Sequence, residues 1–169
     1  MFSSNRPVSG RSLIAGALIC SISLPASAVA VRTQPLRFFE GRTEMLSVVK
    51  VIMKKPYRSR TLGAGRILPD GSLALIQQVY DEGQAPEQRR WNVRQLGPGH
   101  FAGTMTDAVG PVVVDEMGGR YRFKFRMKGN LAIEQWVTPL PGGTSARTNL
   151  TVRKLGMQVA SSVGTIRRV

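Results

Sequence analysis

The chain has 169 residues with 24 Lys and Arg against 10 Asp and Glu, a formal net charge of +14. This length suits one domain with a sizeable core and leaves little room for a multidomain arrangement. The charge predicts an anionic partner such as nucleic acid, an anionic membrane or an acidic polymer, while charge that merely keeps the protein soluble is the alternative.

The amino-terminal segment has the layout of a secretory signal peptide. Arg6 and Arg11 precede the apolar run 13–24, and the small residues 26–28 follow Pro25. A basic start, a short apolar run and a small-residue cleavage pattern together are typical of exported proteins. We therefore predict an exported, periplasmic protein, with a retained amino-terminal anchor as the alternative.

Cleavage is expected after Ala28, with Ala30 as the second choice, so that 1–28 is the signal peptide and 29–35 a short flexible lead. Cleavage would also remove Cys20, the single cysteine of the chain. Lipid attachment at Cys20 is not expected, because Ile19 stands where a lipobox needs a small residue. Export argues against nucleic acid as the partner and favours anionic material of the cell envelope.

Turn signals divide the rest of the chain at intervals of about 8–14 residues, which is typical of antiparallel sandwiches and barrels. Asp70-Gly71 is the strongest of them and predicts a two-residue hairpin loop. Between the turns, residues favour strands rather than helices. The segments with this pattern are 45–54, 72–81, 90–96, 100–107, 112–117, 131–138 and 146–155.

The tail 157–169 fits a helix or a strand, and nearby glycines favour the strand. About eight to ten antiparallel strands predict an all-β fold, a single closed or nearly closed barrel over 36–169. An outer-membrane barrel has similar alternation and remains an alternative, although the chain has few aromatic residues and ends in Arg-Arg-Val.

The clearest strand is a ladder of alternating charge. Five cations alternate with four large apolar residues over 120–128, so one face of the strand should be apolar and the other basic. The cations, candidates for binding an anionic surface, are Arg120, Arg122, Lys124, Arg126 and Lys128.

The turn after this ladder, Gly129-Asn130, fixes how the next strand pairs. A two-residue loop would put Leu131 and Ile133 on the basic face, whereas a three-residue loop puts them on the face of Phe123 and Phe125. We therefore predict a three-residue loop, with Gly129 or Asn130 at positive φ. This register places Glu134 opposite Lys124 or Arg126 and Trp136 near the cations.

Residues for a defined chemistry are scarce. His100 is the lone histidine, no Gly-x-Ser-x-Gly accompanies it, and no metal-ligand spacing appears. Gly63-Ala64-Gly65 lacks the features of a nucleotide loop and predicts a bend or bulge in a strand. Paired carboxylates could run acid–base chemistry, but the sequence does not bring two together. The acidic candidates are Asp81, Glu82, Asp107, Asp115, Glu116 and Glu134.

A ligand cavity would be lined by aromatic residues, for which Trp91, Phe123, Phe125 and Trp136 are the candidates, with core packing as the alternative reading. Asp107 could lie at the mouth of the cavity or simply bond the backbone of a turn. Arg89-Arg90 would add to the basic surface or be solvated. We predict no catalytic residue, no metal and no cofactor.

A set of short motifs resembles the proteobacterial envelope family known as domain of unknown function 3833. The resemblance covers 36–169 and implies an exported, lipocalin-like β-barrel with no established activity; many relatives are lipoproteins, whereas this chain lacks a lipobox. The matching motifs are Phe38-Phe39-Glu40-Gly41, Gly65 with Asp70-Gly71, Arg90-Trp91, Gly103-Thr104, Asp107-Ala108-Val109-Gly110, Gln135-Trp136 and Lys154-Leu155-Gly156.

Three functions remain open. The first is non-enzymatic binding of an apolar or amphipathic, lipid-like ligand at the cell envelope. The second is a filled-core interaction module whose basic face, 120–128, contacts anionic lipid, polysaccharide or protein. The third is a small hydrolase or isomerase, which would need two convergent carboxylates in a cavity or His100 beside an acid. The sequence leaves the oligomeric state undetermined.

Overall fold

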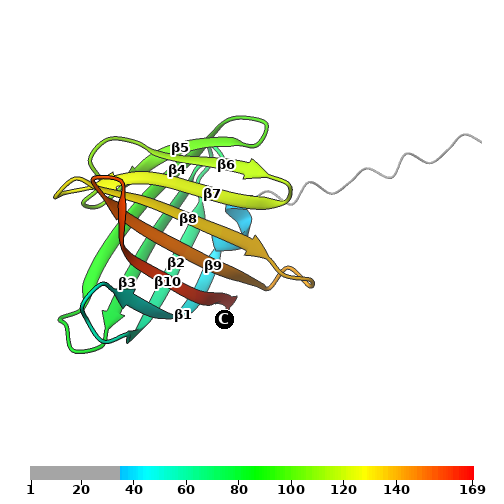
Figure 1. Ribbon diagram of the computed structural model, residues 1–169. Coiled ribbons are helices and arrows are strands. Elements are labelled where there is room, and N and C mark those ends of the chain that lie inside the picture. Colours follow the sequence, from blue (N-terminus) through cyan, green and yellow to red (C-terminus); the bar gives the residue numbers. More distant parts are fainter. Residues whose placement is uncertain (1–34) are drawn as a thin grey trace, which may run out of the picture. The chain divides into compact units, whose positions relative to one another are not determined.

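The computed structural model describes residues 35–169 and shows a closed barrel of ten antiparallel strands (Figure 1). The predicted signal peptide 1–28 and the predicted lead, apart from its last residue, lie outside the described residues. A short 3-10 helix, η1 (Pro35–Phe39), precedes the barrel. The strands are β1 (Gly41–Val51), β2 (Tyr57–Ile67), β3 (Leu73–Asp81), β4 (Glu87–Gly97), β5 (His100–Met105), β6 (Val112–Met117), β7 (Arg120–Met127), β8 (Leu131–Pro139), β9 (Ser145–Lys154) and β10 (Met157–Arg168).

Each strand pairs with the next along the chain, and β10 pairs with β1 to close the barrel. The closed order leaves none of these strands with an unpaired edge, which is how barrels avoid edge-to-edge aggregation. The predicted all-β barrel of about eight to ten strands is confirmed. The preference for a strand over 157–169 is also confirmed, because β10 pairs with both β9 and β1.

The pairing of β7 with β8 confirms the predicted register. Met127 pairs with Leu131 and Phe125 with Ile133, so three residues separate the strands. Gly129 (φ 77°) and Asn130 (φ 57°) both have positive φ. The apolar residues of β7 consequently face the interior and its cations face outward.

Strand β2 falls in a stretch that the hydrophobic pattern does not mark as a strand. Its buried positions are occupied by Ser59, Thr61 and Gly63, while Arg58 and Arg60 face outward. Because small and polar residues take the interior positions, the usual apolar alternation is missing.

The predicted length of one turn is corrected. The hairpin at Asp70-Gly71 exists, but Ile67 pairs with Leu73 and the loop is longer than two residues. Inside it, the Asp70 carboxylate accepts hydrogen bonds from the Ser72 N–H (3.0 Å) and hydroxyl (2.7 Å). These bonds hold the wider turn and lower the pKa of Asp70 from its ordinary value.

The predicted bulge at Gly63-Ala64-Gly65 is wrong, because β2 keeps an unbroken register with both neighbours there, whereas the alternative of a bend stays a prediction. These glycines serve close approach instead. A Cβ on Gly65 would overlap the carbonyl oxygen of Phe39, and one on Gly63 would overlap the hydroxyl of Thr43. The missing side chain of Gly65 lets η1 lie against the inner wall of the barrel, and that of Gly63 leaves room for Thr43 on β1.

Helix η1 marks one end of the barrel, which we call the plug end; the opposite end is the far end. Leu36 is buried in the core, and Phe39 contacts Phe38 and Phe123 edge-on at ring centroid distances of 5.1 and 6.4 Å. The hairpins β1–β2, β3–β4, β5–β6, β7–β8 and β9–β10 lie at the far end, since β1 starts beside η1 and the strands alternate in direction.

Candidate functional site

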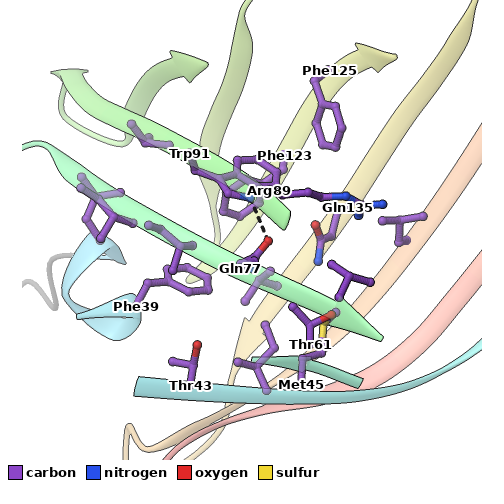
Figure 2. Close-up of a pocket in the computed structure, with 18 residues that line it drawn as sticks. Phe39, Thr43, Met45, Thr61, Gln77, Arg89, Trp91, Phe123, Phe125 and Gln135 are labelled. Atoms are coloured by element: carbon purple, nitrogen blue, oxygen red, sulfur yellow. Dashed lines mark hydrogen bonds between the residues drawn. The ribbon is translucent and has the colours of Figure 1, made fainter. Parts of the chain in front are cut away.

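The barrel encloses a cavity of about 100 Å³ between η1 and the middle of the strands (Figure 2). Its wall is mostly apolar, with Leu73, Leu75 and Val93 among the buried residues that contribute to it. Ligand pockets for drug-sized molecules usually hold about 300–1,000 Å³. This chamber therefore suits a small molecule or one end of a slender apolar chain.

Three of the predicted cavity residues line this chamber: Trp91 from β4, and Phe123 and Phe125 from β7. Trp91 stacks edge-on against Phe125 with ring centroids 5.6 Å apart. The structure corrects the expected placement of the other two. Trp136 follows the inward-facing Gln135 on β8 and so faces outward.

Asp107 lies in the turn after β5 at φ 66°, away from the lining of the cavity. Its carboxylate is 4.0 Å from the Lys128 ammonium, and neighbouring backbone groups close the turn, with the Ala108 N–H donating to the Met105 carbonyl. Asp and Asn tolerate positive φ better than most residues, which explains an aspartate here. Asp107 is therefore a residue of a turn and not of the cavity wall.

Polar groups in the cavity are few and mostly paired. The Trp91 indole N–H donates to Gln77 Oε1 at 2.8 Å, a bond drawn in Figure 2. The Gln135 amide donates to the Thr148 hydroxyl, also at 2.8 Å. These bonds fix the rings and amides that shape the chamber, as buried polar groups require.

Among the residues that the structure describes, Arg89 is the one ionisable residue that lines the cavity. Its Nη2 donates to Glu87 Oε2 at 3.1 Å, whereas its Nε is buried and has no hydrogen-bond partner among the described residues. A buried charged donor without an acceptor is costly, and an acceptor that reached it would bind favourably. The expectation that Arg89 would belong to the basic surface or be solvated is wrong, because Arg89 shares strand parity with Trp91 and Val93 and so faces inward.

The inner edge of the site toward the far end is polar. Burial raises the pKa of Tyr57, and the charges of Asp81 and Glu87 raise it further, whereas Arg89 lowers it. These four groups are therefore close enough to interact electrostatically. The side chain of Glu87 is 63% accessible, so solvent screens the attraction between its carboxylate and the Arg89 guanidinium.

The basic ladder faces outward and is partly neutralised. Arg122 donates to Asp115 Oδ2 at 3.1 Å, and the guanidinium of Arg120 lies 4.4 Å from the centre of the Trp136 ring. Glu134 pairs with Lys124 across the strands, as predicted, while its carboxylate accepts from the Trp136 indole at 3.1 Å. The face thus keeps fewer unpartnered cations than its sequence suggests.

His100 does lie beside an acid, because its Nδ1 is 3.1 Å from Asp115 Oδ1. The pair sits on the outer surface, with 70% of the histidine side chain exposed, and Arg122 occupies the other oxygen of Asp115. Hydrogen bonds from Arg122 and His100 lower the pKa of Asp115, so the carboxylate stays ionised. No serine hydroxyl bonds to this pair among the described residues, and it lies outside the cavity.

Over the described residues, no group of His, Cys, Asp and Glu side chains is arranged to hold a metal ion. In that same part of the chain, none of the helical segments has the length and apolar character needed to cross a membrane. The aromatic and amide residues around Arg89 therefore form the candidate site, a binding chamber with one interior cation.

No family model matches the chain, and no curated protein matches it. Solved structures share its lipocalin-like fold. The S-type phycobiliprotein lyase of Guillardia theta superposes with a TM-score of 0.60 at 7% identity, covering 79% of this chain and 90% of that one. Rv2717c of M. tuberculosis gives a TM-score of 0.60 at 13% identity, covering 80% and 96%.

A DUF3598-family protein of unknown function from Nostoc punctiforme gives a TM-score of 0.58 at 13% identity. The match covers 79% of this chain and 49% of that protein. At these identities the likeness shows the fold alone. The resemblance to domain of unknown function 3833 stays a prediction.

Proposed function

We propose that this protein is a non-enzymatic binding barrel for a small apolar or amphipathic ligand with an acidic head group, acting at the cell envelope. The observation that carries the proposal is an apolar chamber lined by one cation, Arg89, whose buried Nε has no acceptor within the described range 35–169. A carboxylate could accept from Nε, while an aliphatic or aromatic body would occupy the space beside Trp91 and Phe125.

Two features favour binding over catalysis. Among the described residues, the cavity is lined by apolar side chains, amides, hydroxyls and the Arg89 guanidinium, with no carboxylate or histidine, so general acid–base chemistry has no obvious agent there. The amide and indole groups are already hydrogen-bonded to one another, which makes them a fixed frame for a ligand. The similarity in fold to a phycobiliprotein lyase is compatible with a ligand-binding role for this barrel.

The test compares octanoic acid with octan-1-ol, which share a chain and differ in the head group. Isothermal titration calorimetry on the full chain measures both affinities for the wild type and for Arg89→Gln. Hydrogen bonds to charged groups contribute about 1.5–3 kcal/mol, so Arg89→Gln should weaken the acid about 10- to 150-fold. The alcohol should bind both proteins alike.

Arg94→Gln is the matched control, because Arg94 belongs to the same strand but is exposed on the outer face. Leu150→Phe, at a half-buried lining position, should fill the chamber and reduce binding of both ligands. Equal weakening of acid and alcohol in Arg89→Gln would contradict the role of Arg89. Failure of the wild type to bind either compound would favour the filled-core alternative.

A further inference from the structure

Two neighbouring hairpins at the far end expose large apolar side chains. Ile52 is 54% and Met53 100% accessible in the β1–β2 hairpin, while Leu155 is 76% and Met157 68% accessible at the β9–β10 turn. The Ile52 N–H donates to the Val159 carbonyl at 3.0 Å and links the two hairpins. Figure 1 shows both at the end opposite η1. We call these four residues the apolar tips.

The backbone makes this exposure more unusual. Met53 has φ 59° and Leu155 has φ 50°, a left-handed conformation that non-glycine residues seldom adopt and that Asn, Asp and Gly tolerate best. The apolar side chains of Met53 and Leu155 remain exposed in the isolated barrel, so burial does not compensate for this unfavourable backbone conformation. A surface that covers the tips would supply that burial.

The two hairpin segments that carry the tips contain cations and no acid, whereas Asp81, Glu82 and Glu87 belong to the β3–β4 hairpin at the same end. No Asp or Glu occurs in 50–56 or in 153–158. The exposed cations of these two segments form no ion pair with any residue that the structure describes. They are Lys50, Lys54, Lys55, Arg153 and Lys154.

We propose that the far end docks on an anionic lipid bilayer, with the apolar tips entering the boundary between head groups and acyl chains. Apolar residues flanked along the chain by cations are the combination that interfacial binding requires, because apolar burial and attraction to anionic lipid add together. Lysine and arginine can bury their aliphatic stems while their charges stay among the head groups. The tips project from hairpin ends, which suits a planar surface. The four tip residues lie outside the ladder 120–128, although Lys128 at the end of the ladder is also at the far end, in the β7–β8 hairpin. The proposed docking does not depend on a ligand in the cavity.

The experiment reads insertion at one position. In the full chain carrying Cys20→Ser, Met53→Cys is labelled with an environment-sensitive dye, and Leu96→Cys is labelled as the control. Leu96 is 62% exposed on β4 near the plug end. With vesicles of phosphatidylglycerol and phosphatidylcholine, the dye at position 53 should shift to the blue, and the dye at position 96 should not. Vesicles of phosphatidylcholine alone should give a much weaker response.

Neutralising Lys50, Lys54 and Lys55 to Gln should weaken vesicle binding about fivefold per lysine, or about a hundredfold together. Neutralising Arg120 and Lys124, ladder cations that lie farther from the β7–β8 hairpin than Arg126 and Lys128, should leave the signal at position 53 nearly unchanged. Equal shifts at positions 53 and 96, or no shift with anionic vesicles, would overturn the proposal. A shift that appears on raising the protein concentration without vesicles would instead assign the tips to a contact between protein molecules.

Discussion

The contact between η1 and β2 makes Gly65→Ala a sharp test of how the plug end is built. Gly65 does not have positive φ, so its backbone would accept alanine, and the cost arises only from the overlap of the new Cβ with the Phe39 carbonyl oxygen. Backbone on both sides cannot rotate away as a side chain would. Overpacking of this kind costs about 1–3 kcal/mol, which for a chain of this size lowers the melting temperature by about 2–4 °C per kcal/mol.

Gly97→Ala provides the matched control. Gly97 also lies in a strand without positive φ, and a Cβ there would meet nothing within 4 Å. Replacement of an unconstrained glycine restricts the unfolded chain and stabilises by about 0.4–1 kcal/mol. Thermal unfolding followed by circular dichroism should therefore move in opposite directions for the two variants.

A second measurement separates displacement of η1 from general destabilisation. Arg37 lies within η1, and trypsin cleaves after arginine, so Gly65→Ala should accelerate cleavage there when the helix is pushed off the wall. Trypsin cleavage after Arg37 should stay at the wild-type rate in Gly97→Ala. If Gly65→Ala melts at or above the wild-type temperature, the close packing of η1 on β2 is refuted.

Two further variants test the surface and the turns. Asp115→Asn should lower the melting temperature at pH 7. Hydrogen bonds from Arg122 and His100 depress the folded-state pKa of Asp115 below its ordinary value of 3.8. The carboxylate therefore stabilises the fold at pH values above 3.8, and this stabilisation is lost as the pH falls through the depressed pKa. Melting curves of both proteins should thus converge in acid, and a constant difference would contradict the ion pair. Gly129→Ala forces a side chain into φ 77° and should cost about 1–2 kcal/mol in chemical denaturation, whereas an unchanged midpoint would argue against the three-residue loop.

The barrel could be predicted because its strands alternate clearly where interior residues are large. In β7 the alternation sets the face of every side chain, and the parity of the following turn is enough to place Ile133 opposite Phe125. The prediction fails for β2, where Ser59, Thr61 and Gly63 occupy the inner face. Their small size leaves room for η1 and the cavity, so the pattern is weakest where the interior is least filled.

The candidate site is harder to predict, because residue type and strand parity indicate opposite faces of the barrel for Trp136 and Arg89. Trp136 suggests a cavity by its aromatic ring, yet its position on β8 directs it outward beneath Arg120. Arg89 suggests a solvated surface by its charge, yet its position on β4 directs it inward beside Trp91. Closure of the barrel decides both cases, since it turns one face of every strand into an interior.

The position of η1 also bears on how a ligand would reach the chamber. Leu36 and Phe39 line the cavity at the plug end and pack against the core, so entry there would require the helix to leave the wall of β2. Arg89 and Val79 line the cavity on β3 and β4 toward the far end, near the polar groups Tyr57, Asp81 and Glu87. An acidic head group that met Arg89 would thus leave its apolar body pointing toward η1. If the far end docks on a bilayer as proposed, the shortest route between lipid and Arg89 runs past that polar edge and leaves the plug in place.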